Sequence, residues 1–210
     1  MKFYMRIVYF SILVLLPFLK NHLKAQNFKR TSLDINVKVN LPENFLIMSD
    51  DDIARKYPSY RKPLAMYTSL DRMADFGYNV SNGVWGDDIN LLRRFYLTTI
   101  KNTFTKVEIL KDTILYSKKK PYFHLEYLSE IHDEENSINS PRPPIKNYTY
   151  SVYTTELGEI YIFNFNCPSL IYEKWRPIAT VIANSITVSK RSKTHDVKII
   201  KKNNTSEKSK

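Results

Sequence analysis

Apolar and polar residues alternate along several stretches of this chain, with the two-residue period of strands that bury one face. The pattern begins at Ile35, Val37 and Val39, and it returns in longer runs through the second half of the chain. It predicts strands at residues 35–39, 45–48, 64–69, 75–81, 107–110 with a continuation at 114–116, 122–131, 147–155 and 160–166. A tight turn at residues 157–159 joins the last two as a hairpin.

The clearest helical spacing lies between these strands, over residues 88–104. Asp87 is the expected cap of this helix. Its buried stripe is predicted to consist of Ile89, Leu92, Tyr96, Ile100 and Phe104, which recur every three to four residues. Its basic residues Arg93, Arg94 and Lys101 fall mostly off that stripe and are expected on a solvated face.

Two shorter helices are also predicted. Ser49 is a suitable N-cap for the first, whose first turn holds three aspartates and which ends near Tyr57. Ser169 starts the second, with Pro177 in its first turns or at a kink. Its apolar face is expected to consist of Ile178, Val181, Ile182 and Ile186.

The first 25 residues have the layout of a secretory signal. Lys2 and Arg6 precede an uncharged apolar run at residues 7–19, shorter than the roughly 20 residues that span a membrane. We expect cleavage after Ala25 and a mature protein in the periplasm or outside the cell. An uncleaved membrane anchor is the alternative, because Leu23 stands third before the cut, where a small residue is preferred.

The net charge of +11 is concentrated at the two ends. The first 25 residues hold four basic residues and no acid, and residues 190–210 hold eight Lys or Arg against Asp196 and Glu207. The stretch between them therefore carries a net charge of only +1. A nucleic-acid-binding fold carries its basic charge on the folded surface, so this distribution argues against that class.

The polar, basic end of the chain predicts a disordered tail. In this tail Lys198, Lys201 and Lys202 are candidates for contact with an anionic surface, such as acidic lipid headgroups, an envelope polymer or an acidic partner. A plain solubilising tail is the alternative. The predicted organisation is a signal peptide at 1–25, a linker at 26–34, a folded domain at 35–188 and the basic tail at 189–210.

The cysteine and glycine content bears on two features of the domain, disulfide bonds and phosphate-binding loops. Cys167 is the single cysteine, so the domain has no intramolecular disulfide and must rely on its core. It lies between an apolar strand and Pro168, and is expected to be a small buried hydrophobic residue. Only 4 glycines occur in the chain, which argues against Gly-rich phosphate-binding loops.

Few candidates for catalysis or metal binding lie within the domain. His124 and Glu126 are two residues apart on a predicted strand and therefore face the same side, where they could act as an acid–base pair. A packed histidine is the simpler interpretation. The acidic stretch at 132–135 and the three aspartates at 50–52 lack the spacing of a metal site. We therefore expect no catalytic residue, metal or cofactor.

The loop at residues 81–87 is a candidate binding segment. It holds two of the 4 glycines, and Trp85 lies beside the start of the longest predicted helix. A tryptophan in such a loop anchors a ligand or partner in some proteins, and covers the edge of the core in others.

The order of these elements resembles that of the PsbP-like superfamily, which includes an extrinsic photosystem II subunit, a Ran-binding nuclear import factor and exported bacterial proteins. The resemblance covers about residues 35–188. It rests on Leu41, Pro42, Phe45, Met48, Ala74, Asp75, Phe76, Val80, Ser81, Phe95, Tyr96, Tyr127, Leu128, residues 150–153 and 161–165, Cys167, Pro168, Trp175, Pro177, Asn184, Ser185 and Ile186. It implies a single α/β (α+β) domain, in which an antiparallel sheet is flanked by helices as an α/β/α sandwich.

The resemblance also implies a function class. Members of the superfamily are generally binding or assembly proteins, which implies a non-enzymatic binding or assembly module, here of the bacterial cell envelope and with an unknown partner. The alternative is a hydrolase-type enzyme with a dispersed site near His124. A cleft lined by His124 and several acids would favour the enzyme, and a smooth surface with an exposed aromatic patch would favour the binding module.

Overall fold

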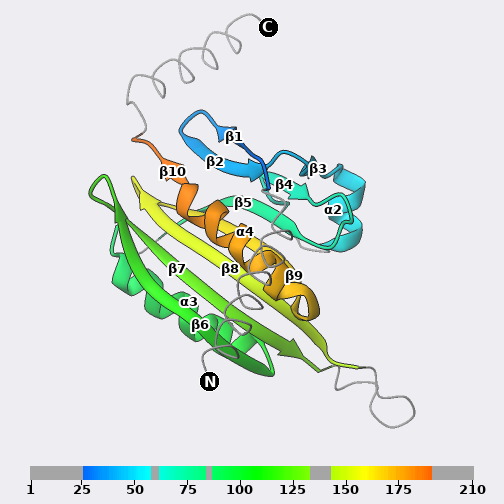
Figure 1. Ribbon diagram of the computed structural model, residues 1–210. Coiled ribbons are helices and arrows are strands. Elements are labelled where there is room, and N and C mark those ends of the chain that lie inside the picture. The colour runs from blue at the N-terminus through cyan, green and yellow to red at the C-terminus, as the bar shows by residue number, and fades with distance from the viewer. Residues whose placement is uncertain (1–25, 58–61, 84–86, 133–142, 191–210) are drawn as a thin grey trace, which may run out of the picture.

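A long antiparallel sheet forms the centre of the computed structural model (Figure 1). The structure describes residues 26–57, 62–83, 87–132 and 143–190. In spatial order the strands of this sheet are β3 (Leu46–Ile47), β4 (Ala65–Thr68), β5 (Asp75–Asn82), β9 (Glu159–Pro168), β8 (Ile145–Glu156), β7 (Lys120–Ile131) and β6 (Lys106–Ser117). The predicted signal, Trp85, the basic tail and most of the acidic loop before β8 lie outside the described residues.

Two tight turns set the register of the four long strands. Lys118 and Lys119 have φ values of 50° and 68° between β6 and β7, and Leu157 and Gly158 have 52° and 78° between β8 and β9. Two consecutive residues with positive φ are typical of the hairpin turns whose twist matches that of the flanking strands. The predicted turn at 157–159 is confirmed, and Gly158 adopts its backbone conformation without the steric cost that a side chain adds.

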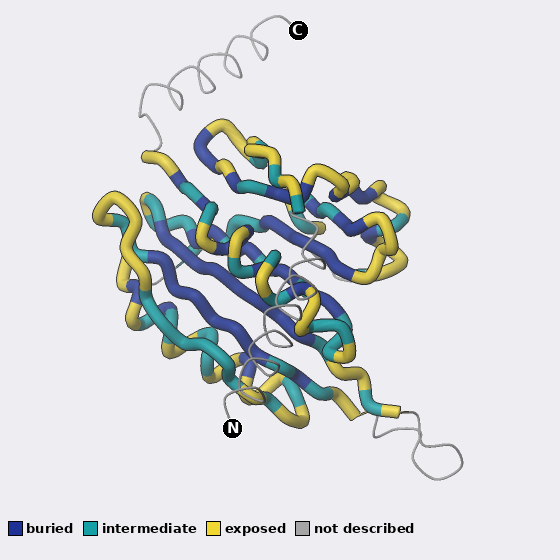
Figure 2. The backbone as a smooth tube through the Cα atoms, viewed as in Figure 1, coloured by how far each residue is buried: buried dark blue, intermediate teal, exposed yellow. Residues whose placement is uncertain are grey.

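The two faces of the sheet bury different residues. On β7, Phe123, Leu125 and Tyr127 pack with α3 (Ile89–Thr103), whereas Tyr122 lies on the opposite face with α4 (Tyr172–Ser185). Figure 1 shows α3 behind the sheet and α4 in front of it, and Figure 2 shows that the central strands are the most buried. The predicted α/β/α sandwich with an antiparallel sheet is confirmed.

A second sheet contains β1 (Phe28–Asp34), β2 (Val37–Pro42) and β10 (Thr187–Val188), in that order. Val37, Val39 and Leu41 of β2 join the same core as α4. The expected linker at 26–34 is therefore wrong for residues 28–34, which pair along β2. This strand escaped prediction because its exposed edge position leaves little alternation in its sequence. Ile35, expected in a strand, lies in the turn and is 68% exposed.

The helices agree with their predicted positions, with one changed cap. Ser49 caps α2 (Asp50–Lys56), and its Oγ accepts a hydrogen bond from the Asp52 amide at 3.2 Å. Asp88, and not Asp87, caps α3, because its Oδ1 accepts from the amides of Asn90 and Leu91 at 2.9 and 3.1 Å. The two aspartates are adjacent, so only the local backbone could decide between them.

Two expectations about helix faces need correction. Arg93 of α3 is not simply solvated, because its guanidinium forms two 2.5 Å hydrogen bonds with Asp112 on β6. Val181 of α4 is 43% exposed, although it was expected in the apolar face. The buried side chains of α4 are Trp175, Ala179, Ile182 and Ala183, which follow a short 3-10 turn, η3 (Ser169–Ile171). Ala179 and Ala183 are small, so α4 can lie close to the sheet. Val181 falls outside the buried stripe of this helix.

Candidate functional site

A cavity of about 430 Å³ lies on the α3 face of the sheet, between the end of α2 and the end of α3. Phe104, the C-cap of α3, forms part of its wall, so the cavity begins where the cover of this helix stops. Its lining residues are Lys56, Tyr57, Arg72, Met73, Asp75, Phe104, Tyr127, Ser129, Asn147, Thr149, Asn166, Cys167 and Pro168.

Strand register brings four polar groups into a row along the floor of this cavity. Asp75 on β5 is opposite Asn166 on β9, Asn166 is opposite Thr149 on β8, and Thr149 is opposite Tyr127 on β7. The Thr149 hydroxyl donates to Asn166 Oδ1 at 2.8 Å. Central strands that are covered on both faces are normally continuous apolar runs. Polar side chains at this row therefore mark the part of the face beside the end of α3.

Asp75 is the most deeply buried charged group of the cavity, at 2% exposure. Its Oδ2 lies 2.6 Å from Lys56 Nζ and also accepts a hydrogen bond from the Tyr57 hydroxyl. Burial, together with this hydrogen bond to the carboxylate, raises the pKa of Tyr57. The other oxygen, Oδ1, is buried and has no hydrogen-bond partner. A carboxylate accepts several hydrogen bonds, so within the described residues Asp75 keeps an unsatisfied acceptor that is buried behind the wall of the cavity.

The rim beside α2 is held by basic residues whose charges are already paired. Lys56 bridges Asp75 and the Arg72 carbonyl oxygen, to which its Nζ donates at 2.9 Å. Arg72 has a φ of 57° and forms an ion pair with Asp52 at 3.2 Å. A non-glycine residue in this left-handed conformation is uncommon and is kept in place by its surroundings. The turn before β5 is thereby attached to the end of α2.

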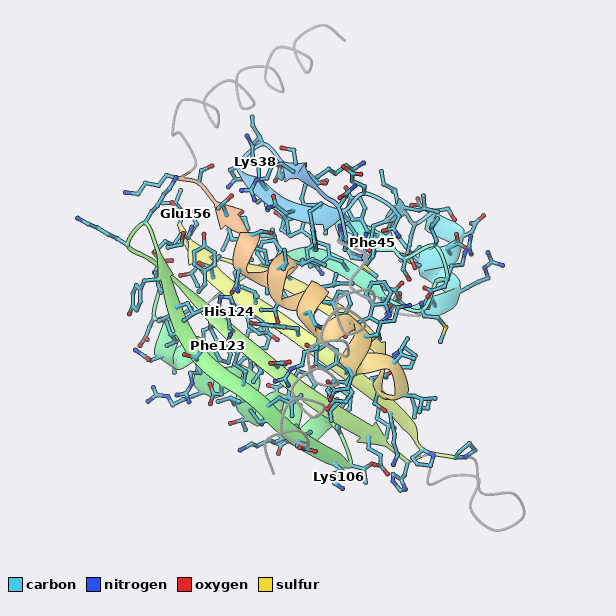
Figure 3. The ribbon with its side chains drawn as sticks, viewed as in Figure 1. Lys38, Phe45, Lys106, Phe123, His124 and Glu156 are labelled. Atoms are coloured by element: carbon cyan, nitrogen blue, oxygen red, sulfur yellow. The ribbon has the colours of Figure 1, made fainter. Side chains whose placement is uncertain are left out.

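His124 and Glu126 lie on the other face of the sheet. Figure 3 shows His124 on β7, next to Phe123. As predicted, both share one face, but each has a different partner. His124 Nδ1 lies 3.3 Å from the Tyr150 hydroxyl, whereas Glu126 accepts from Tyr148 at 2.9 Å and from Arg176 Nε at 2.6 Å. Burial lowers the pKa of His124 to about 4, and the nearby Lys111 charge adds to this shift.

The cavity beside His124 does not have the lining of an acid–base site. It measures about 250 Å³. Among the described residues its walls are Leu115, Tyr116, Ser117, Tyr122, Ala183, Asn184 and Ile186. None of these is acidic, and the Glu126 carboxylate is engaged by Arg176. On this face of the sheet, His124 and Glu126 therefore belong to a polar network inside the core, in which both have hydrogen-bond partners.

The other sequence candidates are a buried cysteine and residues that lie outside the described part of the chain. Cys167 is 3% exposed, as expected for a small buried residue, and burial raises the pKa of its thiol to about 12. In the described part of the chain, no three His, Cys, Asp or Glu residues are grouped as metal ligands. Trp85, Lys198, Lys201 and Lys202 belong to segments that the structure does not describe.

Sequence reasoning missed the residues of the cavity, above all Asp75, Thr149 and Asn166. The available signal was the polar residue at every second position of two long, otherwise aromatic strands, at residues 147, 149 and 151 and again at 164 and 166. Such polar positions are expected on the solvated face of an edge or half-exposed strand. Only the strand order shows that β8 and β9 are central.

The two-sheet arrangement with α3 and α4 on opposite faces is that of the PsbP-like fold. The solution structure of cyanobacterial PsbP (CyanoP) from Synechocystis sp. PCC 6803 matches with a TM-score of 0.53 and 12% identity, over 80% of this chain and 96% of that one. The Saccharomyces cerevisiae Ran-binding protein Mog1p matches with a TM-score of 0.51 and 11% identity, over 79% of this chain and 97% of that one. At these identities the likeness shows the fold alone.

Sequence comparison adds one relative. Inheritance of peroxisomes protein 2 of Candida glabrata is 31% identical over 122 residues, which make up 57% of this chain. The same residues span 16% of the length of that protein. No protein-family model matches the chain. Within the described residues, no helix is long and apolar enough to cross a membrane.

Proposed function

We propose that this protein is a non-enzymatic binding module whose ligand site is the cavity between α2 and α3. The observation that supports this most directly is the Asp75 carboxylate, which is 2% exposed, lines the cavity and has an oxygen without a hydrogen-bond partner. An unmade hydrogen bond at a buried group costs about 1–3 kcal/mol. Oδ1 is closed off from solvent, so a ligand recovers that cost when its binding displaces the atoms that cover Oδ1 and brings a donor to it.

The hydrolase alternative has less support. A hydrolase needs a base within reach of the group that it activates and a partner that orients the base. His124 is hydrogen-bonded to Tyr150, and Glu126 is engaged by Tyr148 and Arg176. The His124 contact therefore joins β7 to β8, and Glu126 joins β7 to β8 and, through Arg176, to α4. The Ran-binding description of Mog1p, which shares the fold, is in keeping with a binding role for this chain as well.

We place this activity in the bacterial cell envelope. The basis is the first 25 residues, with a charged start and a short apolar run before Ala25. On this proposal the chain acts as a periplasmic or extracellular protein. Its basic tail, through Lys198, Lys201 and Lys202, provides a peripheral contact with an anionic surface.

Native mass spectrometry of the protein released gently from the envelope fraction tests the binding role. We expect the wild-type protein to carry an added small-molecule mass and the Asp75→Asn variant to lose it. Asp112→Asn is the matched control, because Asp112 pairs with Arg93 away from the cavity. An added mass that persists in Asp75→Asn, or a wild-type protein without any, would contradict the proposal.

A further inference from the structure

The cavity between α2 and α3 has the chemistry of a site for an uncharged, polyhydroxylated ligand. We propose that it binds a neutral saccharide, an assignment that rests on the proposed function and makes it more specific. Three properties of the lining support it: the charges are paired, the neutral polar groups both donate and accept, and aromatic rings form one wall.

The paired charges argue against ionic ligands. Asp75 is paired with Lys56 at 2.6 Å, and Arg72 with Asp52 at 3.2 Å. A cationic ligand that approaches Asp75 meets the Lys56 ammonium first, and an anionic ligand that approaches Lys56 meets the Asp75 carboxylate. Removing an ion from water without an unpaired counter-charge is unfavourable, so a neutral ligand fits this lining better.

The hydrogen-bonding groups match hydroxyls. Asn147, Asn166, Thr149 and Ser129 are neutral side chains that each donate and accept, and they come from three adjacent strands. Asp75 Oδ1 only accepts; it has no partner among the described residues, and a donor reaches it once the atoms that cover it are displaced. A sugar presents several closely spaced hydroxyls, each of which donates one hydrogen bond and accepts others. One sugar hydroxyl that donates to Asp75, with neighbouring hydroxyls that bind the side-chain amides of Asn147 and Asn166, would satisfy both kinds of group.

The aromatic wall supplies the apolar contact that a sugar also needs. Phe104 and Tyr127 both line the cavity, with ring centroids 6.1 Å apart and planes inclined at 50°. The C–H face of a pyranose ring packs on aromatic rings, while its hydroxyls point outward to polar groups. The volume of about 430 Å³ lies within the range of about 300–1,000 Å³ that is usual for small-molecule sites.

Isothermal titration of the full-length protein with four probes tests the assignment. N-acetylglucosamine and maltose represent neutral sugars, whereas glycine and inorganic phosphate represent zwitterionic and anionic ligands. We expect at least one sugar to bind and both charged probes to fail. Asp75→Asn is expected to raise the Kd of that sugar at least tenfold, which corresponds to about 1.4 kcal/mol.

Two further variants keep the test decisive. Asn147→Ala, at a half-buried lining position, should also raise the Kd, and it replaces Asp75→Asn if that variant fails to fold. Asp112→Asn should leave the Kd unchanged, because Asp112 does not line the cavity. If glycine or phosphate binds in an Asp75-dependent way and neither sugar does, the cavity is a ligand site but the saccharide assignment is wrong. If no probe binds, or if sugar binding survives both cavity variants, the saccharide assignment is wrong, whatever the mass-spectrometry result for the proposed function.

Discussion

Single residues in this protein change their chemistry according to which face of the sheet they occupy. His124 and Asp75 are both almost fully buried, at 3% and 2% exposure. Burial and the nearby Lys111 charge favour the neutral form of His124, whose Nδ1 lies 3.3 Å from the Tyr150 hydroxyl. Asp75 forms an ion pair with Lys56 and retains one oxygen without a partner among the described residues. The first residue belongs to a polar network inside the core, whereas the second lies beside the proposed ligand cavity.

The lowered pKa of His124 predicts a loss of stability in acid. The folded protein binds this proton only near pH 4, whereas the unfolded chain binds it near the ordinary value of 6.5. Stability from the neutral imidazole is therefore complete above pH 6.5 and is lost as the pH falls toward 4, by an amount on the order of 2–3 kcal/mol. Urea unfolding of wild type and His124→Gln at several pH values measures this loss of stability. The carboxylates contribute equally to both proteins, so the difference between their pH profiles is due to His124.

His132 offers the matched control for this measurement. It lies exposed just beyond the end of β7, with Glu130 as its partner. His132→Gln leaves the buried His124 in place, so it should retain the acid loss of stability that His124 contributes. Parallel curves for wild type and His124→Gln would show that His124 does not titrate as its surroundings indicate.

At the scale of elements, helix ends decide where the cavity lies. α3 ends at Thr103, with Phe104 as its cap, and the cavity lies beside this end, next to the row from Asp75 to Tyr127. The sequence predicted this helix and its buried stripe, because helical periodicity is a local property. It did not predict the cavity, because the row consists of four residues from four strands whose register depends on the whole sheet.

The start of α3 provides a sharp test at this scale. Asp88→Ala removes the acceptor of two amide hydrogen bonds, so it should lower the free energy of unfolding by about 1 kcal/mol. Asp87→Ala, one residue earlier, should change it by less than about 0.5 kcal/mol. Denaturant unfolding at pH 7 compares the two variants. A larger effect of Asp87→Ala would show that Asp87 caps α3, as the sequence alone suggested, and that Asp88 does not.

At the scale of the whole molecule, the two ends of the chain have opposite expected effects. β1 pairs along β2, and its Phe28 and Leu33 pack against the core. The tail after Lys190 is basic and adds little apolar sequence. The first segment is therefore expected to belong to the cooperative fold, and the second is not.

Truncation tests this expectation against the chain that runs from Gln26 to Lys210. Ending the chain at Lys190 should change the free energy of unfolding by less than about 0.5 kcal/mol. Beginning it at Ile35 should cost more than about 1 kcal/mol, because β2 loses one of its two partner strands and two apolar side chains lose their burial. Thermal melts measure both. Equal melts for all three chains would contradict the role of β1, and a large loss on tail removal would contradict that of the tail.

The amino-acid sequence by itself determined the period of most strands, the Ser49 cap, the Gly158 turn and the burial of Cys167. These features follow from side-chain alternation, backbone preferences and capping, which act over a few neighbouring residues. Tertiary structure alone decided that residues 28–34 form an edge strand, that Asp88 caps α3 and that Val181 faces outward. It also brought Asp75 to Asn166 and Thr149, because a periodic pattern says which face is buried and not which strand lies beside it.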